Sequence, residues 1–124
     1  MSFRKRLAGF ACIAIGIGVV IGAFGAHKMQ EVLSAKQLVT YSTAVRYWFY
    51  NCIGLLAIAA LGPQFTIKKS STLVIILGTV VFCFSLWLNA LLGVKSFGMI
   101  APIGGLTMVA GWLLTGYSIL RSKK

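Results

Sequence analysis

Acidic residues are almost absent from this chain. Glu31 is the single acid among 124 residues, against 12 Lys and Arg, and the formal net charge is +11. A glycosidase-type site needs a pair of carboxylates, and a two-metal hydrolytic site also depends on several acidic ligands. The composition therefore excludes both of these classes of hydrolytic enzyme.

Histidine and cysteine are also scarce. The chain has one histidine, His27, and three scattered cysteines, Cys12, Cys52 and Cys83. No cluster has the spacing of metal ligands, and no nucleophile, base and orienting group can be assembled. Cys12 and Cys52 are expected toward opposite membrane faces, farther apart than the roughly 7 Å that a disulfide permits. We therefore predict a protein that is not an enzyme and has no metal or other cofactor.

Charge of either sign is rare, and long apolar runs take its place. Charged residues make up 10% of the chain and hydrophobic residues 59%, whereas soluble domains carry about 25% charged residues. A membrane core of about 30 Å is crossed by roughly 20 apolar residues, and continuous apolar runs cross it as helices. The predicted fold is all-α: one domain, residues 1–124, forming an integral membrane four-helix bundle. Its spans are predicted at about 7–26, 43–67, 72–94 and 98–120.

The first span has a second interpretation. A basic segment at residues 4–6, an apolar run and the small residues near Ala23 together resemble a signal peptide, whose removal would leave three spans. Signal peptides usually have 7 to 15 apolar residues, and this run is longer. Retention of the span is favoured.

Basic residues flank the apolar runs, which favours anionic lipid headgroups over nucleic acid as their partner. Eight lie in the terminal segments and the second connection, and four lie in the first and third connections. Lys and Arg are enriched in cytoplasmic loops, so both termini are expected in the cytoplasm. The eight are Arg4, Lys5, Arg6, Lys68, Lys69, Arg121, Lys123 and Lys124, and the four are Lys28, Lys36, Arg46 and Lys95.

The connections carry local signals of their own. We expect a short interfacial helix from near Lys28, a break near Ser34, and then a helix that runs into the second span. Ser34 and Gln37 have the spacing of a capping box. The second connection is expected to be a tight turn centred on residues 68 and 69, and the third a short loop over residues 95–98. Pro102 is expected to end, begin or kink a helix.

Small residues recur at helical spacing in the first and fourth spans. Helices in lipid associate through close packing at such residues, so these two faces are predicted to lie inside the bundle. They comprise Ala14, Gly18, Gly22 and Ala26 in the first span, and Gly104, Gly105, Thr107, Gly111 and Thr115 in the fourth. Tyr47, Trp48, Tyr50 and Trp87 are expected in an aromatic belt at the outer surface, and Trp112 in the packed core.

The remaining polar residues are expected to gather in the outer third of the membrane. They are His27, Glu31, Arg46, Asn51 and Asn89. Ionisable and amide groups inside a membrane are often functional, so an outward-facing polar pocket is one hypothesis. The competing interpretation is structural: His27 at a helix end, Arg46 reaching toward headgroups, and the asparagines bonded across helices.

Three stretches together resemble a known family. They are Gly22-Ala23-Phe24-Gly25-Ala26-His27, Thr43-Ala44-Val45-Arg46-Tyr47, and Ala101-Pro102-Ile103-Gly104-Gly105 with Gly111-Trp112. Their order and spacing resemble the YgdD/YwdK-like family of small membrane proteins, domain of unknown function four-two-three. The resemblance implies a retained first span and a bacterial inner-membrane location, and it implies no activity.

The chain also departs from that family pattern. The family usually has a glutamine and then a histidine after the second stretch, and here these positions hold Trp48 and Asn51. A Phe-Ser-Gly-Ser run is replaced by Phe82-Cys83-Phe84-Ser85. A proton-handling role that needs a second histidine is therefore in doubt.

The chain is rich in packing features and poor in reactive groups. We therefore expect an accessory, assembly or interaction subunit that docks on a larger membrane complex or on a second copy of itself. The alternative is a small-ion or solute permeation protein that uses the outer polar residues.

Overall fold

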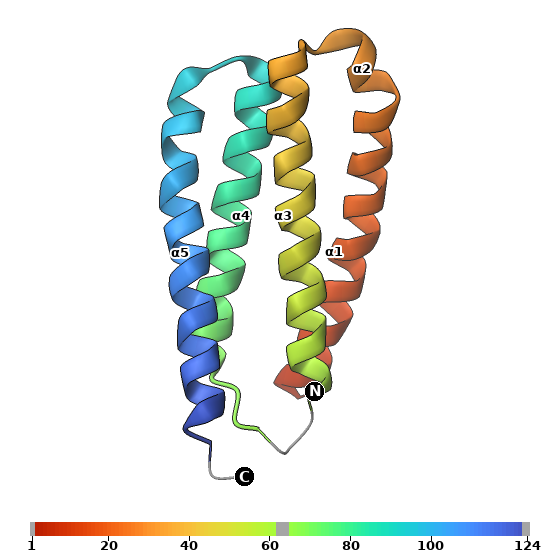
Figure 1. The fold of residues 1–124 in the computed structure, drawn as a ribbon. Helices are drawn as coiled ribbons and strands as arrows, with labels where there is room; N and C mark the ends of the chain where they lie inside the picture. Colours follow the sequence, from red (N-terminus) through yellow and green to blue (C-terminus); the bar gives the residue numbers. More distant parts are fainter. Residues whose placement is uncertain (1, 62–64, 123–124) are drawn as a thin grey trace.

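The chain folds into four long helices and one short helix. A computed structural model describes residues 2–61 and 65–122. The helices are α1 (Phe3–Ala26), α2 (Lys28–Val32), α3 (Ala35–Ala60), α4 (Lys69–Leu92) and α5 (Lys95–Leu120). The long helices run up and down in turn, so the first and last described residues lie at the same end of the bundle (Figure 1). We call this the terminal end, and the opposite end, which carries α2, the α2 end.

The lengths and compositions of these helices suit a membrane. Three stretches are long and apolar enough to cross one: Phe3–Val32, Lys69–Leu92 and Lys95–Leu120. The remaining long helix, α3, has 26 residues. It is less apolar than the other three, because it carries polar residues such as Arg46 and Asn51. The prediction of an all-α four-helix bundle is confirmed.

The first connection has the predicted local structure. The α2 helix occupies the position of the expected short helix, and Ser34 then caps α3 in an extended conformation. The Gln37 amide N–H donates to the Ser34 hydroxyl at 3.2 Å, and the Ser34 N–H donates to Gln37 Oε1 at 2.8 Å. Gln37 Nε2 also donates to the Ala90 carbonyl at 3.1 Å, so the same side chain ties the start of α3 to α4.

Other boundaries differ from the prediction. The predicted second span, 43–67, corresponds to a helix that begins at Ala35 and ends at Ala60, and residues 62–64 of that span lie outside the described residues. Lys69 is the first residue of α4, so the predicted tight turn at 68–69 is wrong. A cap at Ser34 and a polar first turn extend α3 outward, which hydropathy alone does not register.

The turn between α4 and α5 is also shorter than predicted. Gly93 adopts a left-handed conformation with φ of 69° and its N–H bonds to the Asn89 carbonyl, which ends α4. Glycine enters this conformation without steric cost and commonly ends helices. Residues 95–98, predicted as loop, already belong to α5, and α5 runs on through Pro102.

Helices α3 and α4 form the central pair. The α1 helix packs on α3 and α5 packs on α4, so the outer helices flank the pair (Figure 1). One buried cluster lies toward the α2 end and a second toward the terminal end. The first is Tyr41, Ala44, Trp48, Cys52, Cys83, Trp87 and Ala90, and the second is Leu7, Leu55, Ile58 and Ile75.

Glycines bring α4 and α5 into close contact. A Cβ atom added at Gly104 would lie 2.5 Å from the Phe82 backbone nitrogen. One added at Gly111 would lie 2.8 Å from the Ile75 nitrogen, and one at Gly78 would lie 2.5 Å from the Met108 nitrogen. These distances are too short for any side chain, so the two backbones approach at three levels through glycine. The small-residue face predicted for the fourth span therefore faces α4.

The small-residue face of α1 lies against α3. A Cβ atom at Gly18 would meet the Trp48 ring at 2.7 Å. Trp48 Nε1 donates to the Ala14 carbonyl at 2.7 Å, so the ring is held at both positions. Gly22 faces Val45, whereas Ala26, predicted on the same face, is exposed. The two small-residue faces thus serve different helix pairs.

Two aromatic residues predicted at the membrane surface are core residues. Trp48 and Trp87 are 9% and 5% exposed, and their ring centroids lie 5.6 Å apart. The belt prediction placed both residues by depth alone. Trp48 faces α1, where its Nε1 donates to the Ala14 carbonyl, and Trp87 packs against Trp48, so both rings lie inside the bundle.

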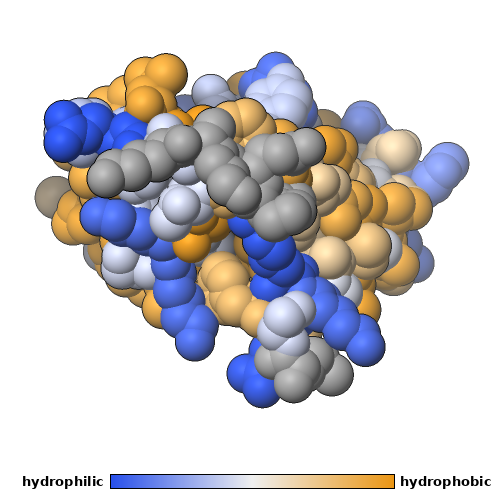
Figure 2. Space-filling model, turned by 90° about the horizontal axis from the view of Figure 1, so that it is seen from below, coloured by the Kyte–Doolittle hydropathy of each residue, from blue (hydrophilic) through white to orange (hydrophobic). Residues whose placement is uncertain are grey.

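Basic side chains surround the terminal end. Figure 2 looks onto this end and shows hydrophilic side chains projecting around hydrophobic flanks. One of them has a structural role: the Arg4 guanidinium donates to the Phe65 carbonyl at 2.8 Å and to the Ile58 carbonyl at 3.5 Å. Arg4 therefore ties the start of α1 to the end of α3.

Substitution of Gly104 tests the close contact of α4 and α5. Gly104→Ala is expected to lower the free energy of unfolding in detergent by about 1–3 kcal/mol, because the added methyl group must displace the α4 backbone. The control is Gly116→Ala, where an added Cβ has no neighbour within 4 Å. Equal stability of both variants would contradict the described packing.

Candidate functional site

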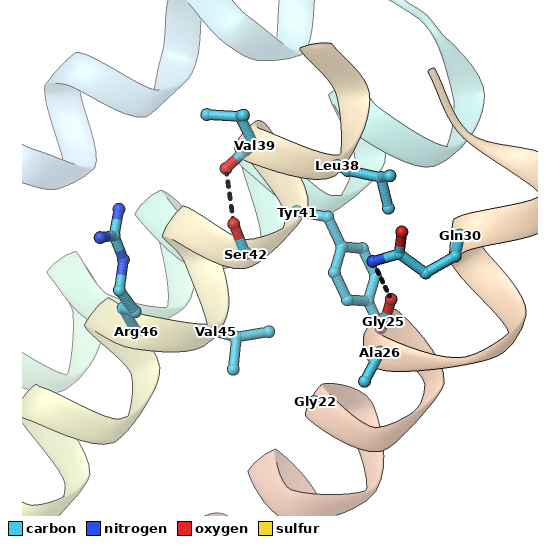
Figure 3. Close-up of a pocket in the computed structure, with 10 residues that line it drawn as sticks. All are labelled: Gly22, Gly25, Ala26, Gln30, Leu38, Val39, Tyr41, Ser42, Val45 and Arg46. Atoms are coloured by element: carbon cyan, nitrogen blue, oxygen red, sulfur yellow. Dashed lines mark hydrogen bonds between the residues drawn. The ribbon is translucent and has the colours of Figure 1, made fainter. Parts of the chain in front are cut away.

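The first two of the three stretches that carry the family resemblance meet in a groove between α1 and α3. The groove has a volume of about 370 Å³ and opens beside the start of α3 (Figure 3). It is lined by Gly22, Gly25, Ala26, Gln30, Leu38, Val39, Tyr41, Ser42, Val45 and Arg46. We call it the α1–α3 groove.

Two glycines and a tyrosine shape this groove. A Cβ atom at Gly25 would lie 2.5 Å from the Tyr41 ring, and the Tyr41 hydroxyl donates to the Ile21 carbonyl at 2.6 Å. Gly22 contacts Val45 one turn deeper. Because Gly22 and Gly25 have no side chains, side chains of α3 pack directly against the α1 backbone at these two positions.

Polar groups lie at the rim of the α1–α3 groove. Gln30 Nε2 donates to the Gly25 carbonyl at 3.5 Å, and the Ser42 hydroxyl donates to the Val39 carbonyl at 3.1 Å. The Arg46 side chain is exposed and donates to the Thr43 hydroxyl at 3.3 Å. The groove thus combines an apolar floor with one full positive charge at its edge.

A second group of polar atoms lies deep between α3 and α5. Asn51 is 4% exposed, and its Nδ2 donates to the Tyr47 carbonyl at 2.7 Å and to Met108 Sδ at 3.2 Å. Its Oδ1 accepts from Trp112 Nε1 at 2.7 Å. A Cβ atom at Gly54 would lie 2.6 Å from the Trp112 ring, so Gly54 provides the space that the ring fills. Asn51 fixes the Trp112 ring, which is partly buried and packs against the cluster of Leu7, Leu55, Ile58 and Ile75.

A wide groove lies beside this network on the lateral surface. It has a volume of about 900 Å³ and an almost wholly apolar lining from α3 and α5, with Phe82 of α4 also contributing. Tyr47 packs edge-on to both Tyr50 and Phe82 within it. Leu106 and Leu113 are exposed along its side. We call it the α3–α5 groove.

The five predicted polar residues are not gathered in one pocket. His27 and Glu31 share a shallow recess with α1 residues at the α2 end. Asn89 Nδ2 donates to the Val94 carbonyl at 2.9 Å and belongs to the α4–α5 turn. Arg46 borders the α1–α3 groove, and Asn51 faces α5.

The positions of these residues along their helices explain this separation. At 1.5 Å per residue, Arg46 lies about 16 Å and Asn51 about 24 Å along α3 from Ala35. His27 and Asn89 both lie at the α2 end, where α1 and α4 finish. Asn51 therefore lies much deeper than the outer third in which the sequence pattern placed it.

The cysteines do not form a site with other reactive groups. Cys12 is exposed, and Cys52 and Cys83 are buried in the cluster near the α2 end. Cys83 Sγ donates to the Ala44 carbonyl at 3.3 Å. Within residues 2–61 and 65–122, no three His, Cys, Asp or Glu side chains are placed to hold a metal ion.

Several structural contacts have no counterpart in the sequence prediction. The sequence pattern places Gly25 only in a motif, and it gives Gly54 and Gly78 no packing role. It counts Arg4 only as a flanking charge, although Arg4 bonds to two carbonyls. A local signal existed for the glycines, since each stands in an apolar run where alanine would favour a helix more.

Comparison with known proteins gives a consistent family. Residues 21–105 match the family described as "Protein of unknown function (DUF423)". This segment begins just before the first resembling stretch and ends at Gly105, so Gly111-Trp112 lies beyond it. It contains all residues of the α1–α3 groove.

Relatives match over most of their length. A UPF0382 membrane protein of Staphylococcus haemolyticus is 36% identical over 109 residues, which cover 87% of this chain and 88% of that protein. One from Staphylococcus saprophyticus is 37% identical over 105 residues, or 84% of each chain. The UPF0382 inner membrane protein YgdD of Escherichia coli K12 is 32% identical over 117 residues, covering 93% and 89%. No solved structure matches.

The bond between Asn51 and Trp112 can be measured by a double-mutant cycle. Asn51→Ala and Trp112→Phe are each expected to lower the free energy of unfolding by about 1–2 kcal/mol, since each leaves a buried polar atom without its partner. The double variant is expected to lose less than the sum, by roughly 0.5–1.5 kcal/mol. Met108→Leu, which removes only one of the two acceptors of the Asn51 nitrogen, should leave the coupling between Asn51 and Trp112 in place. Strict additivity would contradict a direct bond.

Proposed function

The chain belongs to the DUF423 (UPF0382) family of membrane proteins of unknown function, and on that premise we propose that it is a non-enzymatic interaction subunit. It is a multi-pass protein of the inner membrane. In the proposed role it docks sideways, in the plane of the membrane, on a transmembrane helix of a larger complex or of a second copy.

The observation that carries this proposal is the contrast between the deep polar atoms and the lateral surface. The buried Asn51 uses both its amide nitrogen and its oxygen in bonds to neighbours. A group with its bonds satisfied in this way has a structural use. The lateral surface, in contrast, has an apolar groove of about 900 Å³ beside this network.

The lining of the α3–α5 groove suits a helix. Aromatic side chains line one side, and on α5 the small residues Gly105 and Pro102 leave the backbone accessible. Small residues and shape matching drive helix association in lipid, because lipid tails offer no hydrophobic contrast. A partner helix would bring side chains into the space that this chain's own side chains leave open.

The permeation alternative loses its starting point. It relied on five polar residues in one outer pocket, and these residues occupy separate places along the described chain. Asn51, the one of these five residues that lies nearest the middle of the bundle, accepts a hydrogen bond from Trp112 of α5.

The orientation is also part of the proposal. At the terminal end the described residues include Arg4, Lys5, Arg6, Lys68, Lys69 and Arg121. The positive-inside rule supports a cytoplasmic position for this end, and hence for both termini.

Site-specific photo-crosslinking in native membranes tests the docking. A photoreactive residue at Leu106, on the α3–α5 groove, is expected to give one discrete protein adduct. The same residue at Leu77, exposed on α4, is the control and is expected to give none. Val109→Trp should abolish the adduct by filling the groove. Adducts of equal yield at both positions, or only uncrosslinked monomer, would count against docking, and the adduct mass separates a second copy from another protein.

Reporter fusions test the orientation. Alkaline phosphatase fused after residue 122 is expected to be inactive, and a fusion within the α4–α5 turn at Val94 is expected to be active, because the enzyme works only outside the cytoplasm. Green fluorescent protein at the same positions should give the opposite pattern. Activity of phosphatase at the C-terminus would reverse the proposed orientation.

A further inference from the structure

Arg46 lies about three turns inside α3. Gly25, one residue before the end of α1, contacts the Tyr41 ring, so the end of α1 lies beside Tyr41. Arg46 follows Tyr41 by five residues, which is about 8 Å deeper along the helix. The apolar α1 ends at Ala26, so the Arg46 backbone lies deeper in the bundle than the end of this apolar helix.

A guanidinium at this depth needs an anionic partner. Charged groups inside a membrane are costly and normally paired. The hydrogen bond that the structure gives this side chain goes to the neutral Thr43 hydroxyl, at 3.3 Å. The single acid of the chain, Glu31, lines the recess with His27, a different recess from the one that Arg46 borders. Arginine has five N–H donors, so most of its capacity is available to a ligand.

The side chain is turned toward the membrane surface. Thr43 precedes Arg46 by three residues, so the bond between them directs the guanidinium toward the start of α3. Figure 3 shows Arg46 at the edge of the groove, with its guanidinium extended along the helix toward Ser42. Long basic side chains reach headgroups in this way while their stems remain in apolar surroundings.

The α1–α3 groove continues from the charge into apolar surroundings. Its floor is formed by Gly22 and Val45, and its rim includes the Gln30 amide and the Ser42 hydroxyl. A ligand that fits both parts has an anionic head and a hydrocarbon chain. The guanidinium fork matches phosphate oxygens in shape and charge.

We propose that Arg46 and the α1–α3 groove form a binding site for an anionic phospholipid. The guanidinium binds the phosphate diester, and the first part of one acyl chain lies against Gly22 and Val45. Lys28, two residues after the groove-lining Ala26, favours a headgroup without its own positive charge. This site is on a different pair of helices from the α3–α5 groove, so its failure would leave the proposed docking untouched.

Native mass spectrometry of the intact protein, released from nanodiscs of equal parts phosphatidylglycerol and phosphatidylcholine, tests the site. The wild type is expected to retain one phosphatidylglycerol. Arg46→Gln is expected to reduce that retention about tenfold, which corresponds to loss of one charge-assisted contact. Arg46→Lys should retain an intermediate amount. Lys36→Gln, which removes an exposed charge at the same end, is the matched control and should change little.

A second pair of variants separates the site from a folding defect. Ala26→Leu projects from the exposed rim into the groove and should reduce retention with Arg46 in place, whereas Ala23→Leu, exposed outside the groove, should not. Circular dichroism should show equal helix content in all variants. Three results would overturn the proposal: equal losses with Lys36→Gln and Arg46→Gln, equal retention of both lipids, or displacement of the lipid by inorganic phosphate.

Discussion

Where α5 crosses α4, Gly104 brings the two backbones so close that a Cβ atom would lie 2.5 Å from the Phe82 nitrogen. Contacts of this kind hold helices together in a solvent as apolar as their own side chains. They recur at Gly78 and Gly111, and at Gly18 the Trp48 ring of α3 packs directly against the α1 backbone. Shape matching at glycines therefore determines how α1 packs on α3 and how α5 packs on α4. The two grooves lie on the surface where no further helix covers these pairs.

Hydrogen bonds add direction to this packing. Trp48 bonds to a carbonyl of α1, Gln37 to one of α4, and Trp112 to the Asn51 side chain. Each bond joins two helices and satisfies a donor that lipid would leave unpaired. Polar residues that look reactive in a hydrophobic sequence are in this way bound to the packing. Arg46 differs from them, because it faces outward and has only a neutral hydroxyl as partner.

The two grooves differ in the chemical character of their linings. The α1–α3 groove lies near the α2 end and combines a cation with an apolar floor, and the α3–α5 groove lies deeper and is lined by rings and aliphatic groups. The family stretches contribute to both: Gly22 and Val45 line the first, and Gly105 and Trp112 line the second. Both grooves use α3, the least apolar of the long helices. The proposed lipid site and the proposed docking site therefore share this central helix.

The sequence by itself determined the membrane location, the four long helices, the short helix before α3 and the cap at Ser34. These follow from apolar length and from capping chemistry, which act over a few residues. Tertiary structure alone decided which helices pair, that Trp48 and Trp87 are core residues, and that Asn51 bonds to Trp112 while Arg46 borders a groove. Each of these depends on which face of a helix meets its neighbours, because successive side chains on a helix point in different directions and an apolar sequence does not show which face another helix will cover.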